Sequence, residues 1–260
     1  MITTRTPQTA SDRAAGPLAL DLDDVTVGYR GIPAVRSLTL EIRSGERLVL
    51  TGPSGCGKST VLRALAGLLP PQSGEVRADG EPVRSTSRDR AMVFQEDALL
   101  PWRTVRSNVV LALGLRGVPR ERRRPDADRW LEEVGLDGYA GHLPRELSGG
   151  MRQRVQLARG LAGAPRAVFM DEPFGALDAQ TRATMQALLL RTLDAHPATV
   201  VFVTHDVAEA VLLGHRVAVM GRRGEPMRAL VDVPDDPAGR AAALAAVQAA
   251  LTSSREEWTQ

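Results

Sequence analysis

The sequence predicts an α/β protein with a parallel-sheet core, an antiparallel β layer and an inserted α-helical subdomain. Continuous apolar runs such as Ala167–Met170 and Thr199–Thr204, joined by helical segments, are typical of buried parallel strands in βαβ units. Near the N-terminus the apolar residues alternate with polar ones, which indicates strands with one buried face. From about residue 102 to 162 the pattern is helical with no convincing strand, which indicates an insertion into the core.

We expect a leader followed by one large domain. The leader, residues 1–17, is rich in Thr, Ser, Gln and Pro and offers little to bury, so it is predicted to be disordered. The domain, residues 18–260, is expected to have three parts. The core covers about 18–101 and 163–221, the helical subdomain about 102–162, and the C-terminal extension about 222–260.

Composition limits the classes of protein. The formal net charge is only +2 and the arginines are spread along the chain, so we expect no nucleic-acid partner. No apolar run approaches the ~20 residues that span a bilayer, and the N-terminus lacks the apolar segment of a signal peptide. The single cysteine excludes an intrachain disulfide and suits a reducing compartment.

The first predicted strands alternate almost strictly between apolar and polar residues and should form the antiparallel layer: Leu18–Leu22, Val25–Val27 and Val35–Ile42. Tyr29 ends the first hairpin arm. Two roles remain open for it: a strand-end aromatic packed on its neighbours, or a ring on which an adenine stacks. We include Tyr29 among the candidate nucleotide-binding residues.

A glycine-rich stretch lies between the apolar run Leu48–Leu50 and the helical segment Val61–Leu65. Its pattern, G-x-x-x-x-G-K-S, is that of a phosphate-binding loop between a strand and a helix. Backbone N–H groups of such a loop surround phosphate oxygens, and the helix start favours negative charge. The residues assigned to nucleotide binding here are Gly52, Pro53, Ser54, Gly55, Cys56, Gly57, Lys58, Ser59 and Thr60.

Lys58 is the only lysine among 33 basic residues. A compact ammonium suits the β- and γ-phosphates of ATP, whereas the planar fork of arginine would not replace it. Ser59 supplies a hydroxyl to Mg²⁺. Cys56 lies near Lys58 and backbone N–H groups, surroundings that favour a thiolate. Two roles remain open for it: a reactive thiol that maleimides modify and that MgATP protects, or a small residue tolerated in a tight loop.

The middle of the chain begins with a turn cluster at Leu69–Gly74 and a short buried strand at Arg90–Phe94. The charge run Arg120–Pro125 is interpreted as a solvated approach to a helix. The helices of the insertion are predicted at Thr104–Leu115, Asp126–Val134 and Met151–Ala162.

Strands and helices alternate again after Arg166. They are predicted at Ala167–Met170, Ala179–Ala195, Thr199–Thr204, after Asp206, and at Arg216–Met220. A last helix has Asp236 as its N-cap and Pro237 at its first position. Its apolar stripe should pack on the core and consists of Leu244, Val247 and Leu251.

Two carboxylates follow the strand at Ala167–Met170. Ligands gather at the carboxyl ends of parallel strands, so we expect Asp171, Glu172 and His205 to converge on the phosphate loop. Asp171 can hold Mg²⁺ through its water shell, and Glu172 can orient or deprotonate an attacking water. Asp206 opens a pattern close to a capping box, which would fix the backbone beside His205.

With these motifs in order, the chain resembles the ATP-binding subunit of ABC transporters over about residues 18–221. Gly52–Ser59 matches the phosphate loop of that family and Ala167–Glu172 its second nucleotide motif. The signature sequence, Q-loop, D-loop and switch histidine are matched by Leu147–Gln153, Gln95, Gly175–Asp178 and Thr204–Asp206.

The resemblance implies a dimer in which two copies enclose two ATP molecules head to tail. The signature residues Ser148, Gly149 and Gly150 of one copy would face the phosphate loop of the other, with Asp178 at the dimer seam. It also implies that Gln95 contacts Mg²⁺ or the attacking water, and that His205 contacts the γ-phosphate and positions the catalytic carboxylate.

Two stretches, Phe94–Trp102 and Met170–Asp178, look like those of bacterial importers for nitrate, sulfonate, taurine or related anions. Importers of thiamine pyrimidine precursors are an alternative. The implied protein is an ATP-hydrolysing subunit on the cytoplasmic face of the plasma membrane. It would bind permease subunits and depend indirectly on an extracytoplasmic solute-binding protein. About forty residues follow Gly221, too few for the regulatory β domain of many sugar importers.

Two other classes are considered. A soluble ABC ATPase of DNA repair, translation or iron–sulfur assembly would show a coiled-coil insertion or a tandem second cassette, and the sequence has neither. A nonhydrolytic scaffold would lack the catalytic carboxylate, whereas Glu172 is present.

An apolar group at the junction of core and insertion, Leu99 to Trp102, has two interpretations. It could pack beneath the insertion. It could instead line a groove that receives a short cytoplasmic helix of the permease, with Trp102 as the anchor.

Overall fold

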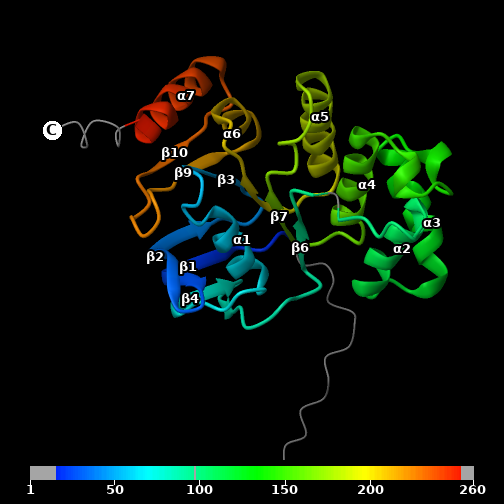
Figure 1. The fold of residues 1–260 in the computed structure, drawn as a ribbon, viewed down its shortest axis with the longest axis horizontal. Helices are drawn as coiled ribbons and strands as arrows, with labels where there is room; N and C mark the ends of the chain where they lie inside the picture. The colour runs from blue at the N-terminus through cyan, green and yellow to red at the C-terminus, as the bar shows by residue number, and fades with distance from the viewer. Residues whose placement is uncertain (1–15, 97, 253–260) are drawn as a thin grey trace, which may run out of the picture.

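The computed structural model describes residues 16–96 and 98–252. The predicted leader therefore lies outside the described residues except for Gly16 and Pro17. The described strands form two sheets, one antiparallel with four strands and one largely parallel with six. Figure 1 shows the helical insertion projecting to one side of these sheets.

The antiparallel sheet has the order β2-β1-β4-β5. Its strands are β1 Leu20–Tyr29, β2 Ile32–Ile42, β4 Ser73–Ala78 and β5 Glu81–Pro82. The two short strands expected before Tyr29 are one strand, because a register shift between Leu22 and Val25 absorbs the polar residues between them. Ser73 and Gly74, predicted to lie in a turn, instead belong to β4, which pairs with β1 in the sheet.

The second sheet has the order β10-β9-β3-β8-β7-β6. Its strands are β3 Arg47–Thr51, β6 Arg90–Val93, β7 Ala167–Asp171, β8 Thr199–Val203, β9 Arg216–Val219 and β10 Ala229–Asp232. All pairings are parallel except that of β10 with β9. Every residue of β7 and β8 is buried, which explains their uninterrupted apolar sequences. The carboxyl ends of five strands therefore meet at one edge.

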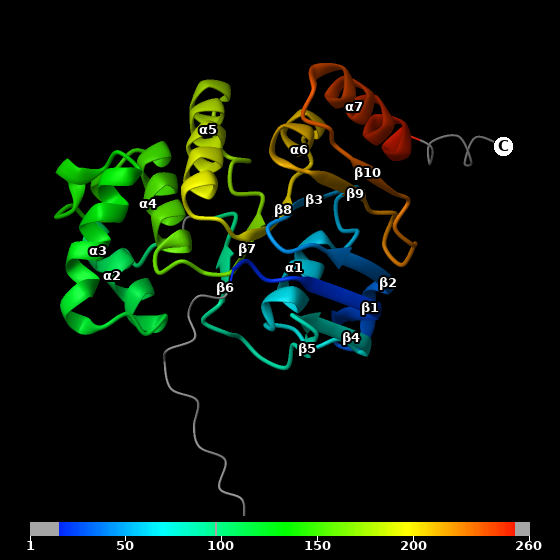
Figure 2. The same cartoon turned by 180° about the vertical axis from the view of Figure 1, so that it is seen from behind.

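Helices cover the parallel sheet on one face, and helix α1 with the antiparallel sheet covers the other (Figures 1 and 2). The helices concerned are α1 Lys58–Ala66, α5 Ala179–Ala195, α6 Val207–Leu213 and α7 Pro237–Thr252. Strand β3 divides its side chains between two cores, with Val49 facing one and Leu48 and Leu50 the other. No described helix has the length and apolar character needed to cross a bilayer.

The C-terminal helix has the predicted cap. Asp236 Oδ1 accepts a hydrogen bond from Gly239 N at 2.8 Å, and the helix begins at Pro237. Val247 is fully buried, and Leu244 and Leu251 pack against the same core.

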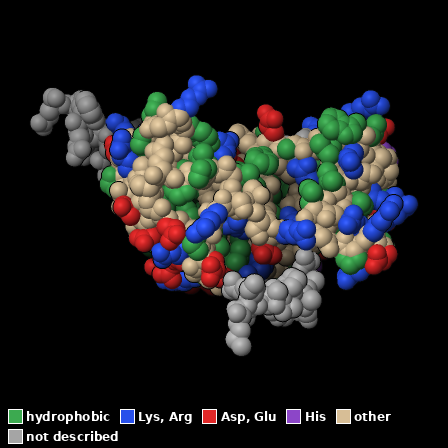
Figure 3. All heavy atoms as spheres, turned by 90° about the horizontal axis from the view of Figure 1, so that it is seen from below, with side chains coloured by type: hydrophobic (Ala, Val, Ile, Leu, Met, Phe, Trp, Pro, Cys, Tyr) green, Lys and Arg blue, Asp and Glu red, His purple; other side chains and the backbone are tan. Residues whose placement is uncertain are grey.

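The segment between β6 and β7 contains no strand among its described residues. Its α-helices are α2 Val105–Leu115, α3 Arg120–Glu133 and α4 Gly149–Leu161. Asn108, fully buried in α2, accepts from Leu100 N at 2.9 Å and donates to three carbonyl oxygens of the preceding turn. These bonds fix the path by which the chain enters the insertion. On the face shown in Figure 3, basic side chains gather over this helical part.

The predicted start of helix α3 at Asp126 is wrong. The helix begins at Arg120, so the charge run is its first part and Pro125 lies inside it. Arginine has a high helix propensity, and a proline this close to the N-terminus removes one backbone hydrogen bond. The buried Asp126 carboxylate pairs with Arg129 and, at 3.7 Å, with Arg122, which ties the two sides of the proline together.

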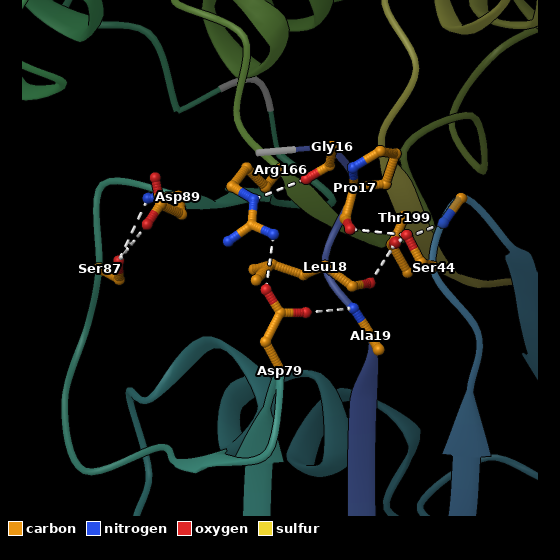
Figure 4. A network of polar contacts seen from close by, with 11 residues as sticks. Gly16, Pro17, Leu18, Ala19, Ser44, Asp79, Ser87, Asp89, Arg166 and Thr199 are labelled. Carbon is orange, nitrogen blue, oxygen red and sulfur yellow. Dashed lines mark hydrogen bonds and ion pairs between the residues drawn. The ribbon is translucent and has the colours of Figure 1, made fainter. Parts of the chain in front are cut away.

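A polar network joins the first described residues to the edge of the core opposite the strand carboxyl ends (Figure 4). Arg166 Nη2 contacts Asp79 Oδ2 at 2.6 Å, and the other oxygen of Asp79 accepts from Ala19 N at 2.9 Å. Thr199 Oγ1 donates to Leu18 O and accepts from Gly45 N. The network thereby fastens β1 and the β4–β5 turn to the starts of β7 and β8.

Candidate functional site

A cavity of about 470 Å³ lies at the carboxyl edge of the parallel sheet. It is lined by Tyr29, Ala34, Gly52, Ser54, Gly55, Gly57, Lys58, Ser59, Thr60, Glu172, His205 and Arg223. The predicted loop residues Pro53 and Cys56 are not in this lining. The segments that meet here are widely separated in the sequence, as the topology of parallel strands requires.

Two glycines of the loop between β3 and α1 are needed for its shape. Gly52 has φ 147° and Gly57 has φ 105°, values that L side chains rarely adopt. A Cβ at Gly57 would lie 2.4 Å from Val35 Cγ2, and one at Gly52 would lie 2.8 Å from Met220 O. Gly57 is also the N-cap of α1 and provides no side-chain cap, so the first N–H groups of the helix are available to an anion.

The ammonium group of Lys58 is folded back across the loop. Its side chain is 6% exposed, and Nζ donates to Gly52 O at 2.9 Å and Pro53 O at 3.0 Å. Both acceptors are neutral carbonyls, so they do not neutralise the buried charge. A phosphate group brought into the loop would supply the missing negative charge.

Cys56 does not have the environment that the sequence suggested. It is buried, at 2% exposure, although Lys58 Nζ lies 4.0 Å from Sγ. Burial raises the pKa of the Cys56 thiol and outweighs the lowering by Lys58. The expectation of a reactive thiolate is therefore wrong, because the loop turns this side chain into the core beside Gly52.

The carboxylates that end β7 are directed to different partners. Asp171 Oδ1 accepts from Ser59 Oγ at 2.8 Å, which joins the strand to the phosphate loop. Burial raises the pKa of Asp171, and the Ser59 hydrogen bond opposes that rise. Glu172 Oε2 instead lies 3.0 Å from His205 Nδ1. Asp171, Glu172 and His205 thus meet at the loop as predicted.

Glu172 has an unusual backbone. Its φ is 45°, in the left-handed region, although it is not a glycine. The residue is held there by its N–H, which donates to Val203 O at 3.0 Å, and by Gly175 N, which donates to Glu172 O at 3.2 Å. Such backbone strain concentrates at functional sites.

The capping box expected after His205 is only half formed. Asp206 caps α6 by accepting from Glu209 N at 3.1 Å. The Glu209 carboxylate does not return to the helix start; it is buried and accepts from Gln186 Nε2 of α5 at 2.8 Å. A tertiary contact replaces the local one, and it joins α5 to α6.

Gln95 is exposed and does not line the phosphate-loop cavity, so the structure does not bring it to the other catalytic candidates. The backbone on either side of it is nevertheless fixed. Gln156 Nε2, from α4, donates to Phe94 O at 2.7 Å and Glu96 O at 2.8 Å. Apart from its place in the helix that begins in the signature sequence, nothing in the sequence indicated this role for Gln156.

Tyr29 lines the cavity and is 45% exposed, so its ring is not a packed strand-end aromatic. Its hydroxyl accepts from Arg63 Nη1 at 2.5 Å, and Arg63 Cζ lies 5.9 Å from the ring centroid. Arg63 therefore holds the ring in the lining of the cavity.

The signature residues lie in a different cavity of about 630 Å³. Ser148, Gly149, Gly150 and Asp178 all line it, and none of its lining residues lines the phosphate-loop cavity. Ser148 caps α4 by accepting from Met151 N at 3.3 Å. Asp178 caps α5 by accepting from Thr181 N at 2.9 Å, and this bond lowers the pKa of Asp178.

A third cavity, of about 570 Å³, runs between the β6 region and helices α2 and α4, and is called the junction groove below. Leu100 lines it, whereas Leu99 is buried in the core and Trp102 is 73% exposed outside the groove lining. Trp102, the expected anchor, therefore does not line this groove. The apolar and basic side chains that line the groove include Phe94, Leu111 and Leu115, and Arg88, Arg90, Arg116 and Arg159. Among the described lining residues there is no carboxylate.

The comparisons with known proteins agree with this geometry. The sequence matches the ABC transporter family over residues 35–175. It is 42% identical over 234 residues to the taurine import ATP-binding protein TauB of Yersinia pestis, covering 83% of this chain and 92% of that protein. It is 45% identical over 219 residues to the nitrate import ATP-binding protein NrtD of Synechocystis, covering 83% and 82%.

A solved structure is also similar, that of the ATP-binding cassette MJ0796, a dimer in a post-hydrolysis state bound to ADP and Pi. The TM-score is 0.73 and the identity 32%, with 84% of this chain and 100% of that chain covered.

Proposed function

This chain belongs to the ABC transporter family as an ATP-binding subunit that hydrolyses ATP, and from that membership we propose that it powers a membrane importer of a small anion such as taurine, another sulfonate or nitrate. The observation that carries the proposal is the similarity to TauB and NrtD, which extends over most of each chain. The test is uptake of labelled taurine and nitrate by cells with and without this gene. Unchanged uptake of both anions, with loss of uptake of a thiamine precursor, would favour that alternative.

ATP would enter the phosphate-loop cavity with its phosphates in the loop. Lys58 would leave its two carbonyl partners and contact the β- and γ-phosphates, while the N–H groups at the start of α1 bind the same oxygens. Tyr29, held by Arg63, would stack on the adenine.

Ser59 and Asp171 would hold Mg²⁺. Their side-chain oxygens lie 2.8 Å apart at the loop, and hard oxygen donors suit this cation. When bound, Mg²⁺ would neutralise charge on the phosphate oxygens. Gln95 would join this set only after its segment moved, since its side chain does not line the cavity.

Glu172 would act as the general base toward the attacking water. Its carboxylate is at the cavity and is 24% exposed, so a water can reach it. His205 lies against the same carboxylate and would hold it while contacting the γ-phosphate.

We propose that catalysis requires a head-to-tail dimer. The signature residues Ser148, Gly149 and Gly150 line a cavity separate from the phosphate loop of their own chain, so they are placed to serve a second copy. The N–H groups at the start of α4 would meet the γ-phosphate bound by the partner. Asp178 lines the signature cavity and would lie at the seam.

The permease would bind at the junction groove. The groove combines leucines with four arginines and no described carboxylate, so it suits a short helix that carries apolar residues and at least one carboxylate. The assembly would place this subunit on the cytoplasmic face of the plasma membrane, with a solute-binding protein acting through the permease. In this arrangement the helical subdomain, about 102–162, would link the permease site to the signature cavity.

A further inference from the structure

The phosphate-loop cavity contains a second permanent cation, Arg223, which comes from the far end of the folded chain. Among the described residues that line the cavity, Lys58 and Arg223 carry permanent positive charges. Arg223 belongs to the turn between β9 and β10, and none of the family motifs recognised in the sequence includes it. Its position becomes apparent only when that turn is seen packed against the β1–β2 hairpin.

The turn that carries Arg223 is held in place from both sides. Glu225 Oε2 accepts from Arg222 N at 2.8 Å and from Arg228 Nη2 at 2.9 Å. Gly224, with φ 79°, donates its N–H to Ala34 O in β2 at 3.3 Å. These contacts fix the backbone of the turn beside the cavity, so the side chain of Arg223 starts from a defined point.

The guanidinium itself is tethered at one nitrogen. Arg223 Nε donates to Pro33 O at 3.3 Å. A guanidinium has five N–H donors, and in the described part of the chain this is the hydrogen bond found for it. The Arg223 side chain lines a cavity whose loop already favours phosphate, and a planar fork of this kind pairs well with phosphate oxygens.

Arg223 lies on the hairpin side of the cavity. Pro33 pairs with Gly28, next to the pairing of Tyr29 with Ile32. Glu172 and His205 instead come from the carboxyl ends of β7 and β8. A nucleotide whose base stacks on Tyr29 would therefore present its nucleoside end, rather than its γ-phosphate, to Arg223.

We propose that Arg223 is a nucleotide-binding residue that pairs with the α-phosphate of ATP. This inference rests on the proposed nucleotide site. Since ADP has the same α-phosphate, Arg223 contributes to the binding of both nucleotides, in contrast to groups that recognise the γ-phosphate. A lysine at this position restores the charge but not the fork, and so restores only part of the affinity.

The test is equilibrium binding of ATP and ADP, with Mg²⁺, by displacement of a fluorescent ADP analogue. Arg223→Ala is expected to weaken both nucleotides by about tenfold, the scale of one charge-assisted hydrogen bond, and to raise the KM for ATP by a similar factor. The nucleotide affinities of Arg223→Lys should lie between those of the wild type and those of Arg223→Ala. The matched control is Arg222→Ala, an exposed neighbour outside the cavity lining, which should bind as the wild type does.

Two results would overturn the inference: affinities of Arg223→Ala equal to those of Arg222→Ala, or a loss confined to ATP, which would place the side chain at the γ-phosphate. Thermal unfolding without nucleotide checks that each variant is folded. Lys58→Ala distinguishes a failure of the Arg223 proposal from a failure of the proposed nucleotide site. If it abolishes binding while Arg223→Ala does not change it, only the role of Arg223 fails; if the wild type binds neither nucleotide, the site itself fails.

Discussion

His205 Nδ1 lies 3.0 Å from Glu172 Oε2, although the two residues are 33 positions apart in the sequence. Strands β7 and β8 are neighbours in the sheet, and Asp171 is paired with Val203, so the residues that follow each strand meet at the carboxyl edge. The histidine side chain is 68% exposed, whereas the glutamate is 24% exposed. The histidine therefore contacts the carboxylate while most of its own side chain stays exposed, and we propose that it also contacts the γ-phosphate of bound ATP.

The first prediction concerns Glu172→Gln. The substitution keeps the shape of the side chain but removes the base, so MgATP should still bind while turnover falls by about 10²- to 10⁴-fold. An ATP-bound dimer should accumulate. Single-turnover hydrolysis and size-exclusion chromatography with ATP measure the two effects, and wild-type turnover in this variant would remove Glu172 from the catalytic role.

The second prediction concerns the lone cysteine. Burial raises the pKa of the Cys56 thiol, so less thiolate is present at neutral pH than in an exposed cysteine. The native protein should react with a maleimide slowly, both with and without MgATP, and quickly in denaturant. Mass spectrometry is unambiguous because the chain has one cysteine. Rapid labelling of the folded protein that MgATP blocks would restore the reactive-thiolate hypothesis.

The third prediction concerns the junction groove. Leu115 is 68% exposed and lines the groove, so Leu115→Ser should leave the fold intact but weaken assembly with the permease. Leu212→Ser, at a 40% exposed leucine on α6 outside the groove, is the matched control. Pull-down with co-expressed permease subunits measures assembly.

Trp102→Ala provides a second comparison at the groove. Trp102 lies outside the lining, so this variant should assemble better than Leu115→Ser. Equal assembly of the Leu115 and Leu212 variants would argue against the groove as the docking site. A larger defect in Trp102→Ala than in Leu115→Ser would return the anchor role to the tryptophan.

The fourth prediction concerns the ion pair between Glu46 and Arg216, whose side chains are 4% and 9% exposed. Glu46→Ala should lower the free energy of unfolding by about 3–5 kcal/mol, because it leaves the buried guanidinium without its main partner. Asp128→Ala, which breaks a more exposed pair with Arg106, should cost about 1 kcal/mol or less. Urea unfolding measures both, and equal losses would show that burial of the pair does not matter.

Local sequence determined much of the fold. Strands β7, β8 and β9 have continuous apolar sequences because both faces of the parallel sheet are covered, and α5 has the predicted bounds, Ala179–Ala195. The phosphate loop could also be recognised, because its glycine spacing follows from backbone angles and close approaches within a few residues.

The tertiary structure decided the features that depend on contacts between distant segments. Glu209 bonds to Gln186 rather than to its own helix start, Cys56 turns into the core, and Trp102 lies outside the lining of the groove that Leu100 lines. Arg223 lines the phosphate-loop cavity only because β9 pairs with β3 and its following turn docks on β2. Periodicity and spacing fix which backbone a segment adopts, whereas the neighbour of each side chain depends on how the sheets and helices pack.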